Sequence, residues 1–120
     1  MLMPEPANKT LLIVVSSDPR TSHRPAEAIR LAAGLAAWRK VDVTLFFGGP
    51  AVLAVNSDAD DFVDEESYRR YLPMFLESSR PVLVEAESAM PLVEPAVIYR
   101  AVSRREFAAE TSRTTYLMRF

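Results

Sequence analysis

The sequence predicts a three-layer α/β protein, in which helices cover both faces of a five-stranded, mostly parallel sheet. Two observations support this fold class. Runs of β-branched and leucine residues alternate with helical patterns along the chain, as in folds built on parallel sheets. The first run, residues 11–15, is continuously apolar, which is typical of a central strand buried on both faces. We expect a single domain over residues 1–120, with residues 1–9 as a flexible lead-in.

The first part of the chain predicts two strands joined by a helix. The strands are expected at residues 10–16 and 41–47, and the helix at residues 25–38. Pro25 suits the first turn of this helix, where its missing N–H removes no hydrogen bond. An apolar stripe at helical spacing predicts the face that packs on the sheet, flanked by small residues that permit close approach: Ala28, Leu31, Leu35 and Trp38, with Ala32, Ala33 and Ala36.

The middle of the chain predicts a glycine turn and two more helical segments. Gly48 and Gly49 precede Pro50, which begins a helix that includes residues 51–55. After a polar stretch, Asp64 is expected to cap a further helix, which Pro73 should kink or split. This helix carries an apolar stripe at i, i+3, i+4, i+7 and i+8: Tyr68, Tyr71, Leu72, Phe75 and Leu76.

The last part predicts three strands and one capped helix. The strands are expected at residues 81–85, 96–102 and 114–120. Between the first two there is room for only two or three helical turns. Ser103 and Glu106 have the spacing of a capping box, which opens a helix that ends near Ser112.

Composition excludes several classes of function. A net charge of −2 gives no electrostatic basis for binding nucleic acid or an anionic membrane. The longest apolar run has five residues, far short of the ~20 that a membrane span needs. The start of the chain has no basic segment before an apolar one, so we expect no signal peptide and a cytoplasmic location. The chain has no cysteine, which excludes disulfides, thiolate metal sites and thiol catalysis.

Three segments together carry a resemblance to a known family. They are the apolar run at residues 11–15 with the alanine-rich helix after it, the strand with paired aromatics and a glycine turn at 43–49, and the capped helix and terminal strand at 103–120. In this order they resemble the DsrE/DsrF-like family, whose members include sulfur-relay subunits. The likeness covers nearly the whole chain. It implies a five-stranded parallel sheet in which the last strand lies beside the first.

The resemblance fails at the residue that does the family's chemistry. The working cysteine of the family lies just after the third strand, where this chain has Glu85 and Ser88. Neither side chain can hold a persulfide, because transfer requires a nucleophilic sulfur. The sequence therefore predicts a non-catalytic subunit or binding module that acts in an oligomer, with a relay-type protein as a partner. We expect no cofactor and no metal.

A second hypothesis is a small-molecule enzyme or a nucleotide- or anion-binding protein that uses the loop after the first strand. This loop offers hydroxyls and two arginines at the start of a helix, but no glycine of the kind a phosphate-binding loop needs. One histidine cannot build a zinc site alone, and no G-x-S-x-G elbow exposes a serine nucleophile. The candidate ligand residues are Ser16, Ser17, Arg20, Ser22, His23 and Arg24 of this loop, with Gly48, Gly49, Glu85 and Ser88.

Two groups of acidic residues also suggest chemistry. Glu85 and Glu87 follow the third strand at its carboxyl end, where α/β ligand sites form, and they are either a general base or solvated carboxylates. The acidic stretch at residues 58–66 lacks the glycine and the final glutamate of a calcium-binding EF-hand loop in register. A solvated loop with helix-capping acids accounts for it.

The expected topology predicts self-association. In the strand order 4-3-2-1-5, right-handed crossovers place the first three helical connections on one face of the sheet and only the helix opened by Ser103 on the other. One helix of about ten residues cannot cover five strands, so the uncovered apolar area should pair with another subunit. We expect a homo-oligomer, by resemblance a trimer or a multiple of it. The residues expected near the contact are Tyr99, Phe107, Tyr116 and Met118.

Overall fold

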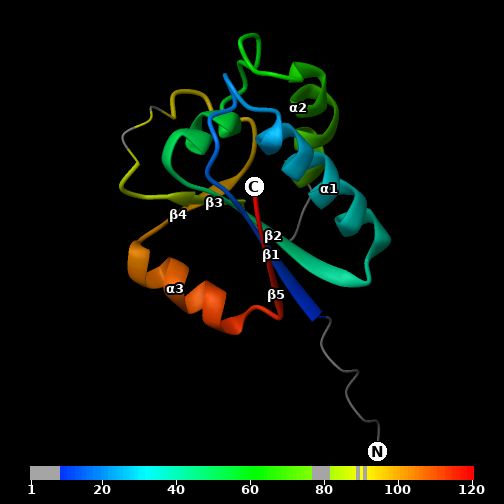
Figure 1. The fold of residues 1–120 in the computed structure, drawn as a ribbon, viewed down its shortest axis with the longest axis vertical. Coiled ribbons are helices and arrows are strands. Elements are labelled where there is room, and N and C mark those ends of the chain that lie inside the picture. Colours follow the sequence, from blue (N-terminus) through cyan, green and yellow to red (C-terminus); the bar gives the residue numbers. More distant parts are fainter. Residues whose placement is uncertain (1–8, 77–81, 89, 91) are drawn as a thin grey trace, which may run out of the picture.

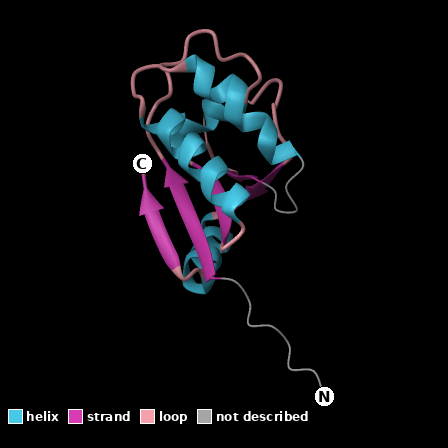
Figure 2. Cartoon of the chain, turned by 90° about the vertical axis from the view of Figure 1, so that its right-hand side faces the viewer, coloured by secondary structure: helices cyan, strands magenta, loops and turns pink. Residues whose placement is uncertain are grey.

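The centre of the protein is a five-stranded sheet whose neighbouring strands all pair in parallel. The computed structural model describes residues 9–76, 82–88, 90 and 92–120. The sheet order is β4-β3-β2-β1-β5, as predicted, and Figure 2 shows β1 and β5 side by side. The strands are β1 (Lys9–Val15), β2 (Val41–Phe47), β3 (Val82–Glu85), β4 (Tyr99–Val102) and β5 (Tyr116–Arg119). Lys9 therefore belongs to β1, and the rest of the predicted lead-in lies outside the described residues.

Helices lie on both faces of this sheet, which confirms the predicted three layers (Figure 1). One face, here called the α1 face, is covered by α1 (Arg24–Trp38), α2 (Glu65–Tyr71) and two 3-10 helices, η1 (Gly49–Val55) and η2 (Leu72–Leu76). The opposite face, the α3 face, carries only α3 (Arg104–Arg113). Within the described residues, no helix is long and apolar enough to span a membrane.

The α1 face holds most of the core, and α1 packs on it through small side chains. The buried residues of this helix include Ala28, Ile29, Ala32 and Ala33. The predicted stripe was wrong in its outer members, since Leu31 and Leu35 are only half-buried and Trp38 is 63% exposed. Alanine has no side chain beyond Cβ, so the helix approaches the sheet most closely through the face that carries its alanines. The leucines then lie at the edge of the interface between helix and sheet.

The α3 face has a much smaller core. It consists of Leu12, Val14, Phe46, Leu83 and Val102, against which Phe107 of α3 packs. The rings of Phe46 and Phe107 are 4.3 Å apart between centroids. No residue of α3 is itself buried, so this face depends on one aromatic contact with its helix.

One predicted helix cap differs from the structure, and two other local predictions are confirmed. Asp64 stands at the start of α2, but its side chain makes no cap, because its backbone is left-handed (φ 57°) and only its carbonyl accepts a hydrogen bond, from the N–H of Ser67 at 3.0 Å. Pro73 ends the α-helical pattern as predicted, and the chain continues as η2. The capping box at Ser103 and Glu106 is present in both of its hydrogen bonds.

The connection from β3 to β4 contains no helix among its described residues, and β4 begins later than predicted. The predicted start of β3 at Pro81 and part of this connection lie outside the described residues. Residues 93–96, which were predicted to form a helix end and the start of a strand, make backbone hydrogen bonds to the end of η1 and to Asn56 after it. The side-chain oxygen of Asn56 accepts from the N–H groups of Val93 and Glu94, and Ala96 donates to the carbonyl of Val55 at 2.7 Å. These bonds hold residues 93–96 against η1, and the backbone meets β3 at Ile98, whose carbonyl accepts from the N–H of Val82 at 3.2 Å.

Three of the four residues expected at the uncovered face point the other way. Tyr116 pairs with Leu11, Met118 with Ile13 and Tyr99 with Val82, and all three partners belong to the core of the α1 face. Paired residues in parallel strands point to the same face. Of the four, only Phe107 contacts the α3 face. The exposed side chains of Tyr99, Tyr116 and Met118 therefore lie on the α1 face, at the two edges of the sheet.

The capping box gives a stability prediction for α3. Ser103→Ala removes the hydroxyl that accepts from the N–H of Glu106 at 3.1 Å, so we expect a loss of about 1 kcal/mol in the free energy of unfolding. Urea denaturation measures it. Ser112→Ala in the last turn of the same helix is the matched control, expected within about 0.5 kcal/mol of wild type. Equal losses in the two variants would contradict a capping role.

Candidate functional site

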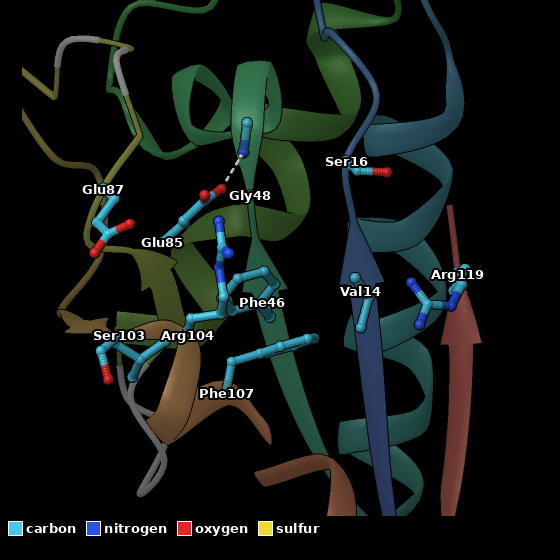
Figure 3. Close-up of a pocket in the computed structure, with 12 residues that line it drawn as sticks. Val14, Ser16, Phe46, Gly48, Glu85, Glu87, Ser103, Arg104, Phe107 and Arg119 are labelled. Carbon is cyan, nitrogen blue, oxygen red and sulfur yellow. Dashed lines mark hydrogen bonds between the residues drawn. The ribbon is translucent and has the colours of Figure 1, made fainter. Parts of the chain in front are cut away.

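A cleft of about 240 Å³ opens on the α3 face, at the carboxyl ends of the strands (Figure 3). Ligand sites of parallel α/β sheets form at this edge, because the loops that leave the strands diverge there. Residues from all five strands, from the loops after them and from α3 line the cleft: Val14, Ser16, Phe46, Gly48, Gly49, Glu85, Glu87, Val102, Ser103, Arg104, Phe107 and Arg119.

The floor of the cleft is apolar and aromatic. Val14 and Phe46 are cross-strand partners on β1 and β2, and Val102 ends β4 on the same face. Phe107 covers Phe46 with its ring tilted by 33°. The period of two along each strand turns these residues to the α3 face, while their neighbours fill the larger core behind.

The Gly48–Gly49 turn forms one wall, and residues at and just after the end of β3 fix it in place. The carboxylate of Glu85 accepts a hydrogen bond from the N–H of Gly49 at 2.7 Å, and the hydroxyl of Ser88 donates to the carbonyl of Gly49 at 3.1 Å. Gly49 is left-handed (φ +55°). A Cβ on Gly48 would lie 2.9 Å from the ring of Phe46. Both glycines are therefore required by the geometry of the turn.

Charged side chains form the rim. Arg104 extends from the start of α3 past Phe46 toward Glu85, and Arg119 extends from β5 toward Val14 (Figure 3). Sequence reasoning missed both arginines. The period of two in the last strand carried the signal for Arg119, which pairs with Val14. Arg104 directly follows the capping serine, and its place in the cleft depends on the packing of α3.

The loop after β1 contributes little to the cleft. Of its six candidates only Ser16 lines the cleft; Ser17, Arg20, Ser22, His23 and Arg24 do not. Most of these polar groups bind one another or nearby backbone. The hydroxyl of Ser22 accepts from the N–H of Arg24 at 3.1 Å, His23 lies 3.3 Å from the carboxylate of Glu27, and Arg24 reaches the carbonyl of Arg119 at 3.4 Å.

Arg20 is held by the loop's own carboxylate. Its guanidinium donates twice to Asp18, at 3.0 and 2.8 Å. These hydrogen bonds lower the pKa of Asp18 below its ordinary value. Because this arginine already has an anionic partner, an external anion would have to displace Asp18 to bind there.

The predicted candidates thus divide into two groups. Ser16, Gly48, Gly49 and Glu85 line one cleft, and Ser88 supports its glycine wall. The remaining loop residues stay outside it. In the acidic stretch, Arg69 pairs with Asp60 and with Glu65. Across the described part of the chain, no three histidine or acidic side chains gather as a metal site would require.

Comparison with known proteins supports the fold. No protein-family model matches the chain, and no curated protein does. The crystal structure of the ychN protein from E. coli superposes with a TM-score of 0.71 at 21% sequence identity, over 93% of this chain and 99% of that one. The likeness confirms the α/β fold that the DsrE/DsrF-like resemblance implied.

The glycine wall of the cleft gives a stability prediction, with a control variant that should change the free energy of unfolding in the opposite direction. Gly48→Ala places a methyl group against Phe46 and the Glu85 carboxylate, so we expect a loss of about 1–3 kcal/mol in the free energy of unfolding. Gly34→Ala, on α1 where a methyl group meets open space, should gain about 0.5–1 kcal/mol. Chemical denaturation of both variants measures this. A Gly48→Ala protein as stable as wild type would contradict the close contact.

Proposed function

We propose that this protein is a non-catalytic binding module, which holds a small ligand in the carboxyl-edge cleft and acts in a homo-oligomer. The observation that carries the proposal is the composition of the cleft. An apolar aromatic floor with a few polar groups around it is the usual build of a small-molecule site. The fold similarity supports only the sheet topology on which the cleft is built.

The side chains in the cleft favour binding over covalent chemistry. The chain has no thiol, and its single histidine lies on the loop after β1 beside Glu27. Neither hydroxyl of the cleft has a basic partner: Ser103 caps α3, and Ser16 has no histidine near it among the described residues. Nucleophilic catalysis requires such a pair. A role beside a relay-type protein would then consist of carrying or sensing a ligand.

Self-association is supported by the exposed apolar surface next to α1. Leu31, Leu35 and Phe120 line a groove at the edge of the α1 face. Tyr116 and Met118, which are 50% and 39% exposed, lie on β5 on the same face. Exposed apolar side chains of this kind on one face mark interaction sites in soluble proteins. We therefore place the contact between copies along α1 and β5, and the trimeric state implied by the resemblance is part of the proposal.

The absence of sulfur transfer is directly testable. Incubation with a sulfane donor carrying radioactive sulfur, followed by desalting under denaturing conditions, should leave no label on the chain, because no residue forms a persulfide. A cysteine-containing sulfurtransferase treated in parallel shows that the donor is active. Stoichiometric label on this chain that a thiol reductant removes would overturn the non-catalytic assignment.

The assembly is tested by sedimentation equilibrium at micromolar concentration. Wild type should give a multiple of 13.4 kDa, and Met118→Glu should give a monomer, because it buries a charge in the proposed contact. Leu117→Glu is the matched control. Leu117 is 37% exposed on the same strand but pairs with Leu12 on the α3 face, so its variant should stay oligomeric. A monomeric wild type contradicts the proposal, and dissociation by Leu117→Glu alone moves the contact to the other face.

A further inference from the structure

The rim of the cleft carries two guanidinium groups that no carboxylate of the protein neutralises. Arg20, Arg69 and Arg100 each form an ion pair with an acidic side chain. Arg104 and Arg119 form none with residues 9–76, 82–88, 90 or 92–120, and both lie at the same cleft. They come from separate elements, α3 and β5, and Figure 3 shows them on opposite sides of the aromatic floor. A guanidinium without a partner beside an apolar surface is a ready site for an anion.

The acidic side chains of the cleft lie at its β3 end, toward which Arg104 extends, and across the floor from Arg119 (Figure 3). Glu85 ends β3 and Glu87 follows it, and one oxygen of Glu85 is already bound to the N–H of Gly49. Figure 3 shows Arg119 on the opposite side of the aromatic floor, beyond Val14. The potential of the cleft therefore becomes more positive from β3 toward β5, and an anionic group is favoured at the β5 end.

Between these ends, the apolar floor favours a ligand whose uncharged part is apolar and flat. Phe46 and Phe107 present ring surface to the cleft, and Val14 and Val102 add aliphatic surface beside them. A flat apolar body would bury this surface and contact the rings. The volume of about 240 Å³ lies just below the range of ~300–1,000 Å³ in which drug-sized ligands bind. The cleft is thus better matched to a single ring than to a nucleotide.

We propose that the cleft binds a small aromatic carboxylate, whose ring lies on Phe46 and Phe107 and whose anionic group lies against Arg119 at the β5 end. This inference rests on the proposed binding function and adds the chemical class of the ligand. It also moves the anion site from the loop after β1, where Arg20 is already paired with Asp18, to the opposite face of the sheet.

Titration of the ¹⁵N-labelled protein with three probes of one shape tests the proposal. Benzoate, benzyl alcohol and benzylammonium share a ring and differ in charge. Benzoate should move the backbone amide resonances of Gly48, Gly49 and Phe107 in a saturable way. The dissociation constant from this titration should be at least about tenfold lower for benzoate than for benzyl alcohol, as expected for a charge-assisted hydrogen bond. Added salt should weaken the binding of benzoate and leave the binding of benzyl alcohol unchanged. Inorganic phosphate, which has no ring, should bind at least about tenfold more weakly than benzoate.

Variants assign the effect to Arg119. Arg119→Gln should weaken benzoate binding at least about tenfold while leaving benzyl alcohol binding unchanged, which shows that the floor is intact. Arg104→Gln, at the end of the cleft near Glu85 (Figure 3), should weaken benzoate binding less than Arg119→Gln does. Arg105→Gln, at the next position of α3 and outside the cleft lining, is the control and should bind benzoate like wild type.

The outcomes separate the two proposals. Benzyl alcohol or benzylammonium binding the same amides as tightly as benzoate would overturn the carboxylate assignment and leave the binding function standing. Phosphate binding as tightly as benzoate would overturn the role of the aromatic floor. If no probe moves a resonance of the cleft, both the ligand class and the proposed binding function fail.

Discussion

The structure depends on one constraint: a single short helix, α3, is the only helix on one face of the described sheet, and it is too short to cover that face. Five strands about 4.8 Å apart span about 19 Å, whereas the ten residues of α3 extend about 15 Å. No residue of α3 is buried, and Phe107 alone packs deeply enough to meet Phe46. The carboxyl edge of this face is consequently left open. The cleft is the space that the short helix does not fill, and its floor is the sheet itself.

The local details of the fold follow from the same constraint. Because α3 makes few apolar contacts, its start is fixed by the capping box between Ser103 and Glu106, whose hydrogen bond to backbone lowers the pKa of the glutamate. This fixes the position from which Arg104 leaves the helix. On the other side, Glu85 bonds to Gly49 and so joins the ends of β2 and β3. Both edges of the cleft are thus held by hydrogen bonds to backbone N–H groups, which the chain supplies before any ligand arrives.

Much of this architecture can be predicted from the sequence, because strands, caps and turns have local signatures. The apolar run at residues 11–15, the glycines after β2 and the Ser103 box each specify their own geometry. Two kinds of feature escape such reasoning. The face that α1 buries depends on how closely its alanines approach the sheet, so Trp38 was expected inside and lies outside. The edge-strand tyrosines and Met118 were assigned to the α3 face, whereas the register puts them on the α1 face.

The residues of the candidate site also divide into those that the sequence predicts and those that it does not. Glu85, Gly48 and Gly49 were found because strand ends meet at one edge of a parallel sheet. Arg104 and Arg119 were missed because their places at the cleft depend on the packing of α3 and on the pairing of β5. The central claim, that this cleft is the ligand site, is tested most directly by a crystal structure of the protein soaked in 4-iodobenzoate. The account predicts an anomalous iodine peak beside Phe46 and Phe107, with the carboxylate against Arg119. An iodine peak confined to the loop after β1, near Arg20 and His23, would contradict it.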